Sequence, residues 1–207
     1  MAIEEVSSAP PNIIWLVAED QSPEWFPMYG DSTISLPNLE SLSKDGVIFN
    51  NAYSPVPVCA PARSSIITGM YPTTLGTHNM RTHAPSRGKG NKPYPNLDIP
   101  SYSPIVPNGV KMFTQYLREK GYYTSNGPKE DYNFQKMSSA WDESSKKHHY
   151  RNRADGQPFF SVFNYSVCHE SQIWKRGKDS LFVNPAEVQV PPYFPDNDTI
   201  RHDLAVY

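Results

Sequence analysis

Two apolar runs divide the chain, and each ends abruptly in polar residues. Residues Ile13–Ala18 are continuously apolar, and the aromatic-rich segment Pro158–Tyr165 follows much later. Runs of this length are typical of strands in a parallel sheet that is covered on both faces. We therefore expect both segments to be buried strands of one α/β domain. Further strands are expected at Val47–Tyr53 and at Tyr122–Thr124.

Helices are expected where apolar residues recur at helical spacing between start and stop signals. The segment Pro37–Gly46 begins at a proline and closes at a glycine, which favours a helix. The apolar stripe in Val110–Leu117 predicts an amphipathic helix of about three turns that ends at Gly121. Strands that alternate with helices in this way predict a mostly parallel central sheet flanked by helices.

Two polar segments are expected at the surface. Residues 82–107 are rich in proline, glycine, serine and asparagine and predict an exposed loop. Basic residues of this region could meet an anionic substrate, although a solvated loop is the simpler interpretation; they are Arg81, Arg87, Lys89 and Lys92. The polar segment Ser138–Gly156 contains His148 and His149, which do not share a helix face and so make a poor metal pair.

Composition narrows the class of protein. The chain has 207 residues, enough for one domain with a core, and its net charge of −2 gives no sign of a nucleic-acid or membrane-surface partner. The 21 prolines favour a loop-rich α/β protein over a helical bundle. The longest apolar run is too short to span a bilayer, and the first residues carry no recognisable secretory signal. We expect Cys59 and Cys168 to be unpaired thiols.

The segment from Cys59 to Gly69 carries the first candidate chemistry. Pro61 suits a first helical turn, residues Ala62–Ile67 can form about two turns, and Gly69 suits the position after the end. Cys59 then lies near the positive end of the helix, with Arg63 within one turn. Backbone N–H groups and a guanidinium together favour a bound anion or a thiolate. The alternative is a buried cysteine in a helix-capping loop.

Polar side chains that follow the two apolar runs carry the second candidate chemistry. Glu19 and Asp20 directly follow the first run, and His169 comes shortly after the second. Because the carboxyl ends of parallel strands meet at one edge of a sheet, we expect the three side chains at the same edge. Carboxylate oxygens suit Ca²⁺ or Mg²⁺. A solvated strand end and a structural histidine are the alternatives.

The pattern Cys59-x-Pro61-x-Arg63, followed by Thr68-Gly69, resembles the signature of type I, formylglycine-dependent sulfatases. Other segments occur in the order that this family shows; they are Pro37–Leu39, Gly46–Phe49, Ala52–Ser54 and Met70–Pro72. The resemblance implies an alkaline-phosphatase-like α/β fold. It also implies that residues 1–207 are the first part of the catalytic domain, without its second half and C-terminal subdomain.

The resemblance assigns a role to each candidate residue. Cys59 would be converted to formylglycine, whose hydrated aldehyde attacks the sulfur of a sulfate ester. Arg63 and Lys129 would bind the sulfate oxygens, and His169 would protonate the leaving oxygen. Asp131 stands where the family usually has a histidine that supports formylglycine, so it would act as a hydrogen-bond acceptor.

The resemblance also implies a metal and a maturation partner. Glu19, Asp20 and residue 59 would hold one Ca²⁺ or Mg²⁺ ion, with Glu19 in the place of the family's first aspartate. A formylglycine-generating enzyme would modify Cys59. Many relatives are periplasmic or extracellular, whereas the sequence itself assigns no location.

Three functions remain open at this stage. The first is a sulfuric ester hydrolase that acts on a sulfated carbohydrate or a small sulfate ester. The second is a phosphodiesterase or phosphonate hydrolase that uses the same formylglycine. The third is a truncated, non-catalytic chain that binds an anion or a partner. The sequence Lys129-x-Asp131 and the loop Thr77–Arg81 give a lead towards sulfated sugars, N-sulfated ones included.

Overall fold

The computed structural model describes residues 9–81, 103–135, 137–176 and 180–207. These residues form two compact units. Unit 1 comprises Met1–Val17 and Ser54–Asn164, and unit 2 comprises Ala18–Tyr53 and Tyr165–Tyr207. Most of the loop expected at residues 82–107 lies outside the described residues, as do the first residues of the chain.

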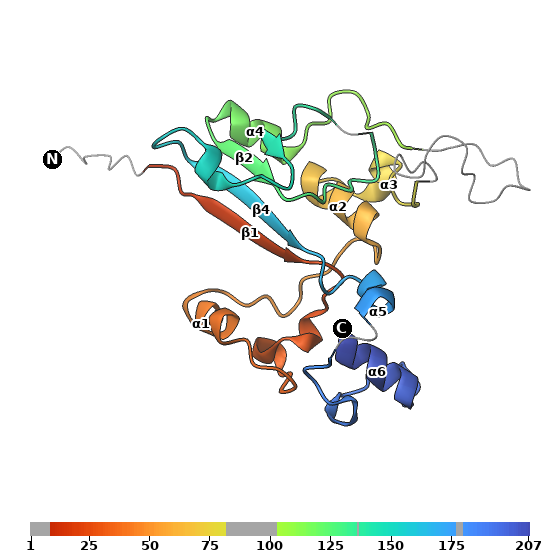
Figure 1. Cartoon of the computed structure of the whole chain (residues 1–207). Helices are drawn as coiled ribbons and strands as arrows, with labels where there is room; N and C mark the ends of the chain where they lie inside the picture. Colours follow the sequence, from red (N-terminus) through yellow and green to blue (C-terminus); the bar gives the residue numbers. More distant parts are fainter. Residues whose placement is uncertain (1–8, 82–102, 136, 177–179) are drawn as a thin grey trace, which may run out of the picture. The chain divides into compact units, whose positions relative to one another are not determined.

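A sheet with the strand order β1-β4-β2-β3 organises unit 1. The strands are β1 (Ile13–Ala18), β2 (Tyr123–Asn126), β3 (Glu143–Ser144) and β4 (Phe159–Tyr165). β2 pairs in parallel with β3 and with β4, and Tyr123 lies opposite Phe159 in that register. Figure 1 shows β1 beside β4 with both arrows pointing the same way. The expected parallel sheet is confirmed.

The two apolar runs form strands as expected, but only one of them is buried. The first four residues of β4 are buried, whereas Ile14 and Leu16 of β1 are 49% and 56% exposed. The predicted burial of β1 on both faces is therefore wrong for the described residues. The alternation along the strand explains this result, because Ile13 and Val17 pack against the core of unit 1 and Ile14 and Leu16 point to the opposite face of the sheet.

Unit 1 also contains short helices. They are α2 (Cys59–Thr68), α3 (Pro72–Leu75), α4 (Phe113–Glu119) and the 3₁₀ turn η4 (Tyr150–Asn152). α4 packs against β2, and α2 contacts α3 and α4 (Figure 1). The predicted helix before Gly121 is confirmed, but it has two turns and starts at Phe113. Met112 is extended, and its N–H donates to the side chain of Gln115, which caps the helix there.

Aromatic rings dominate the core of unit 1. The ring of Phe160 lies 5.0 Å from Trp15, 5.2 Å from Phe113 and 6.0 Å from Trp141, measured between ring centroids. Trp141 is 7% exposed, and its indole N–H donates to the hydroxyl of Tyr132 at 2.9 Å. The prediction of a surface segment at residues 138–156 is therefore wrong in part, because one large apolar side chain draws that segment into the core.

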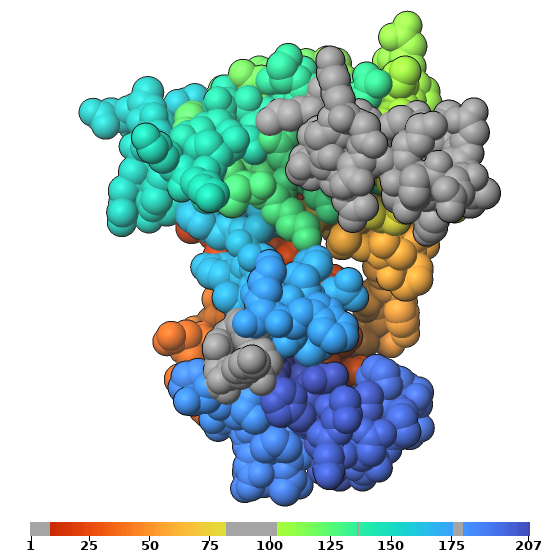
Figure 2. All heavy atoms as spheres, turned by 45° about the vertical axis from the view of Figure 1, so that its right-hand side comes forward, coloured from red at the N-terminus to blue at the C-terminus, as the bar shows by residue number. Residues whose placement is uncertain are grey.

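Short helices joined by irregular loops form unit 2. They are α1 (Pro37–Asp45), α5 (Ser171–Arg176), α6 (Asp198–Val206), η1 (Pro23–Trp25), η2 (Pro27–Tyr29) and η5 (Pro185–Glu187). The helix expected at residues 37–46 is confirmed as α1. The side chain of Asn197 caps α6 by accepting from the N–H of Ile200 at 3.0 Å. No residue of α6 is buried, and its dark blue atoms lie on the surface seen in Figure 2.

The strand expected at residues 47–53 is wrong. This segment contains a turn at Asn50 and Asn51, and it pairs with no strand of the described sheet. Val47 is 78% exposed and Phe49 is 70% exposed, so the β-branched and aromatic residues that suggested a strand bury little surface. Strand propensity without a pairing partner does not produce a strand.

The expectation about the two cysteines agrees with the structure. Both cysteines are free thiols, Cys59 half-buried and Cys168 buried, as predicted. Burial raises the pKa of the Cys168 thiol, which disfavours its reactive thiolate form. Among the described residues, no helix has both the length and the apolar character that crossing a bilayer requires.

Candidate functional site

The start of α2 presents Cys59. Val58 precedes the helix in an extended conformation and supplies no side-chain cap, and Gly69 closes it in the left-handed conformation at φ 68°. A buried serine fixes the helix to the loop that follows it. The Ser64 hydroxyl lies 2.7 Å from the carbonyl oxygen of Pro61 and 2.7 Å from the Thr77 hydroxyl. The expected placement of a free cysteine at the start of a short helix is confirmed.

Arg63, one turn after Cys59, connects two strand ends of the sheet. Its Nη2 donates to Asn164 Oδ1 at 2.9 Å, and its Nη1 donates to the carbonyl oxygen of Lys129 at 3.2 Å. Asn164 lies near the end of β4, and its amide donates in turn to Asn126 Oδ1 at 3.1 Å. The guanidinium is thereby held in one orientation next to the segment that carries Lys129.

Asn164 is a residue that the sequence analysis did not single out. It is the one amide side chain in a strand whose other residues, apart from Ser161, are aromatic or apolar, and that contrast is the signal that could have identified it. Its partners Arg63 and Lys129 lie 101 and 35 residues away in sequence, so the contact itself has no local pattern. In the structure it orients the arginine of the signature.

Asp131 faces the cysteine. Its Oδ2 lies 3.9 Å from the Sγ of Cys59, within the range of a weak S–H···O hydrogen bond. Its Oδ1 forms an ion pair with Nη2 of Arg81. The backbone at Asp131 is left-handed, with φ at 44°, a conformation that aspartate tolerates better than most residues. The structure thus places the acceptor expected from the sequence beside position 59.

Lys129 and the loop Thr77–Arg81 reach this region in different ways. The backbone carbonyl of Lys129 accepts from Arg63, so the segment that carries the lysine belongs to the cluster. The loop is fixed by Asn133, whose amide donates to the carbonyl oxygens of Thr77 and Asn79 at 2.7 Å each. His78 in the same loop is exposed. A sulfate-binding role for Lys129 stays a prediction.

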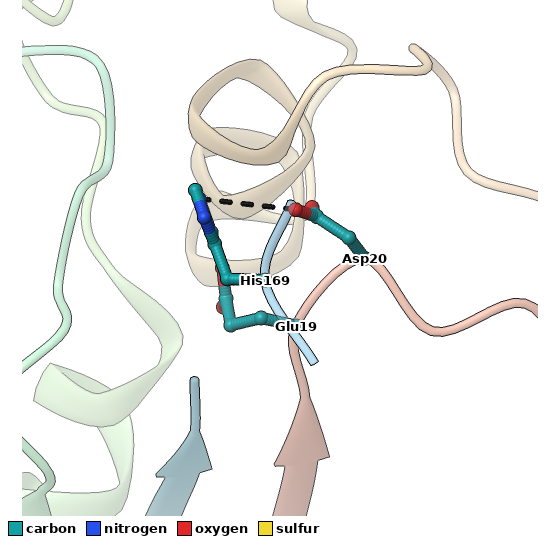
Figure 3. A group of neighbouring side chains, drawn as sticks. All are labelled: Glu19, Asp20 and His169. Atoms are coloured by element: carbon teal, nitrogen blue, oxygen red, sulfur yellow. Dashed lines mark ion pairs between the residues drawn. The ribbon is translucent and has the colours of Figure 1, made fainter. Parts of the chain in front are cut away.

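A second cluster lies in unit 2, where the chain leaves β1 and β4. Figure 3 shows Glu19 and Asp20 beside His169, with a dashed line from the imidazole to Asp20. The three side chains each offer a ligand atom within 4.8 Å of the others. Glu19 is 3% exposed, and its N–H donates to the carbonyl oxygen of Tyr165 at 3.0 Å, which ties the two strand ends together. The expectation that these residues share one edge is confirmed.

The hydrogen bonds of His169 decide which ring nitrogen carries the proton. The backbone N–H of Ser171 donates to Nδ1 at 3.2 Å, so Nδ1 acts as an acceptor in the neutral ring. The proton of that tautomer is then on Nε2, which lies 3.8 Å from Asp20 Oδ2. In this neutral tautomer Nε2 can donate a hydrogen bond towards Asp20.

The donor set of the second cluster fits a divalent cation. Glu19 and Asp20 supply carboxylate oxygens, the hard ligands that Ca²⁺ and Mg²⁺ prefer, and Glu19 is buried. Asp20 is held in place, because its Oδ2 accepts from the N–H of Glu170 at 3.2 Å and its carbonyl oxygen accepts from the Tyr207 hydroxyl. Among the described residues, no other group of three potential ligands lies this close together.

The comparison with protein families gives a match over most of the chain. The model of the family described as sulfatase matches residues 11–190. The chain belongs to the sulfatase family. The resemblance drawn from the Cys59 segment is thereby confirmed.

Individual sulfatases add detail. An ulvan-active sulfatase from Formosa agariphila is 37% identical over 94% of this chain, which spans 37% of that relative's length. A solved 2-O GAG sulfatase matches 90% of the chain with a TM-score of 0.59 and 16% identity, and 41% of its own chain is covered. A structure in complex with its substrate D-glucosamine-2-N,6-O-disulfate matches 77% with a TM-score of 0.56 and 18% identity, and 35% of its chain is covered. The expected α/β fold of sulfatases is confirmed.

Proposed function

We propose that the protein containing this chain is a sulfatase that hydrolyses sulfate esters through a formylglycine at position 59. The observation that carries the proposal is the position of Cys59 at the start of α2, with Asp131 Oδ2 at 3.9 Å and a fixed Arg63 one turn away. Membership of the sulfatase family supports it. The hydrated aldehyde supplies a nucleophilic hydroxyl that a thiol does not have.

The chain's own residues provide the other requirements of sulfate ester hydrolysis. Negative charge builds on the leaving oxygen, and His169, whose Nε2 lies 3.8 Å from Asp20 Oδ2, is the proposed acid in its protonated form. Arg63 and Lys129 are proposed to bind sulfate oxygens, since cations aimed at an anionic group stabilise its transition state. Asp131 is proposed to accept a hydrogen bond from the hydrated residue 59.

We further propose that Glu19 and Asp20 hold one Ca²⁺ or Mg²⁺ ion. The support is the pair of carboxylates within ligand distance of each other in unit 2. A divalent ion would neutralise part of the negative charge of a bound sulfate. Residue 59 as a further ligand is what the family resemblance implies.

For the substrate we propose a sulfated carbohydrate. The support is the nature of the relatives, which include a structure whose substrate is D-glucosamine-2-N,6-O-disulfate and a 2-O GAG sulfatase. Conversion of Cys59 would require a formylglycine-generating enzyme as a maturation partner.

The test uses the protein expressed from its complete gene together with a formylglycine-generating enzyme. The tryptic peptide Asp45–Arg63 contains Cys59 but not Cys168, so its mass reports the conversion of that one residue. Turnover is measured on aryl and sugar sulfates and on phosphate diesters, for the wild type, Cys59→Ala and the matched control Cys168→Ala.

We expect conversion at position 59 and turnover of sulfate esters that is lost in Cys59→Ala and kept in Cys168→Ala. Faster turnover of phosphate diesters would favour the phosphodiesterase or phosphonate hydrolase instead. An unmodified thiol at position 59 in fully active protein would overturn the formylglycine mechanism. Protein that converts Cys59 and turns over no ester would favour the non-catalytic alternative.

A further inference from the structure

Asp131 is held at both of its carboxylate oxygens. Oδ1 forms an ion pair with Nη2 of Arg81, and Oδ2 lies 3.9 Å from the Sγ of Cys59. Arg81 is itself fixed, because its backbone N–H donates to Asn133 Oδ1 at 2.9 Å and its Nη1 lies 3.4 Å from the same oxygen. Asn133 is 1% exposed and has little room to move. The contacts at Oδ1 therefore determine which way Oδ2 points.

The negative charge of Asp131 also requires a nearby cation. A carboxylate beside residue 59 repels any anion that approaches that residue, and a sulfate ester is an anion. The side chains of Arg81 and Asp131 are only 26% and 20% exposed, so solvent screens the pair incompletely. The guanidinium cancels this repulsion where water alone would not.

Arginine suits this position better than lysine would. Its planar group reaches Asp131 with one nitrogen and Asn133 with another, so the ion pair has a fixed geometry. A lysine would carry the same charge on a single ammonium group at the end of a flexible side chain. The chain thus has both a charge partner and a rigid support for the carboxylate that faces residue 59.

We propose that Arg81 is a positioning residue for the reaction at position 59, which holds Asp131 Oδ2 toward that residue and cancels its charge toward an anionic substrate. The inference rests on the proposed sulfatase function and adds a residue to it. Arg81 acts through Asp131.

The first test reads the local charge without any turnover. In protein made without the maturation enzyme, the Cys59 thiol is alkylated with neutral iodoacetamide and with anionic iodoacetate. The thiolate attacks the carbon of both reagents and displaces iodide, so the ratio of the two rates is independent of the thiolate fraction and reports the charge near Sγ. The peptide Asp45–Arg63 separates Cys59 from Cys168.

We expect Arg81→Ala to lower the ratio of iodoacetate to iodoacetamide rates by about threefold, a size typical of a partly exposed charge pair. Asp131→Asn should raise the ratio, because it leaves the charge of Arg81 uncompensated. The double variant should return towards the wild-type ratio, because it removes both charges of the pair. A ratio unchanged in Arg81→Ala would overturn the inference.

Arg118→Ala is the matched control. Arg118 forms an ion pair with Asp142 at 2.8 Å in the same unit, and the two side chains are 34% and 29% exposed. Its loss should lower thermal stability at least as much as Arg81→Ala does, while the alkylation ratio at Cys59 stays at the wild-type value. An equal fall of the ratio in both variants would mean that general loosening of the fold explains it, and would overturn the inference.

The second test uses the matured protein. Arg81→Ala should lower kcat by up to about 100-fold, as misplacement of a reacting group does. Arg81→Lys should restore the alkylation ratio and leave kcat reduced. Full kcat in Arg81→Lys would show that charge alone suffices and would overturn the positioning role. If the wild type hydrolyses no sulfate ester, the proposed function fails, and the alkylation ratio still decides on Arg81.

Discussion

Replacing Asn133 by alanine should strongly destabilise unit 1. The amide donates to the carbonyl oxygens of Thr77 and Asn79 at 2.7 Å each, and Oδ1 accepts from the N–H of Arg81 at 2.9 Å. Asn133 is 1% exposed, so water cannot replace these three bonds freely. Its backbone is left-handed, with φ at 59°.

The expected loss follows from these contacts. Three hydrogen bonds at about 1 kcal/mol each give about 3 kcal/mol. Alanine in the left-handed conformation adds about 1 kcal/mol. The sum of about 4 kcal/mol is a large share of the 5–15 kcal/mol by which a typical domain is stable. Asn133→Gly avoids the left-handed strain and should recover part of the loss.

Two measurements check this expectation. Urea unfolding followed by tryptophan fluorescence gives the change in free energy, and hydrogen exchange at the Arg81 amide reports the loss of its acceptor. Asn152→Ala is the control, because the Asn152 amide also makes two hydrogen bonds, to Glu143 Oε2 at 2.7 Å and to the Lys147 carbonyl oxygen at 3.3 Å, but at the exposed surface. It should cost less than about 1 kcal/mol. A loss below about 1 kcal/mol in Asn133→Ala, or continued protection of the Arg81 amide, would refute the reasoning.

Three further predictions concern other parts of the fold. Tyr132→Phe should cost about 1–3 kcal/mol in urea unfolding, because it leaves the buried indole N–H of Trp141 without its acceptor. Burial, with a contribution from the hydrogen bond to Glu143, raises the pKa of Tyr123 from 10.0 to about 12. As pH rises, the Tyr123 hydroxyl therefore loses its proton at a lower pH in the unfolded state than in the folded state. The contribution of Tyr123 to the free energy of unfolding should be constant below about pH 10 and fall between about pH 10 and 12. A series of melting curves in which Tyr123→Phe shows the same fall would contradict this prediction. Asp20→Asn should weaken Ca²⁺ binding measured by calorimetry, since it removes one of the proposed ligand charges; unchanged affinity would exclude Asp20 as a ligand.

Local patterns in the sequence predicted most helices and strands, but not which strands pair or which residues are buried. The apolar run Ile13–Ala18 correctly gave a strand and the position of its carboxyl end. Its burial could not be read from the same residues, because burial depends on which distant segments pack on each face of the sheet. The segment Val47–Tyr53 fails for a related reason, since strand-forming residues there have no partner strand among the described residues.

In the candidate site, too, local patterns predicted some residues, whereas residues that depend on long-range contacts were missed. Cys59, Arg63 and Asp131 were predictable because a spaced motif marks them, and the acidic pair after the first strand was predictable from its position at a strand end. Asn133 and Asn164 were not predicted. Each acts through hydrogen bonds to residues 35 or more positions away, so no local spacing pattern in the sequence could have indicated them.

Backbone conformation explains why aspartate or asparagine occupies three positions in or beside the two clusters. Among the described residues, the non-glycine residues with a left-handed backbone are Asp20, Asp131 and Asn133, with φ between 44° and 59°, and all three lie in or beside the two clusters. Aspartate, asparagine and histidine are the side chains that tolerate this conformation best. The resemblance puts a histidine where this chain has Asp131, so the exchange stays within the set that the backbone allows. The carboxylate then needs a cation that the imidazole would not need, and Arg81 provides it.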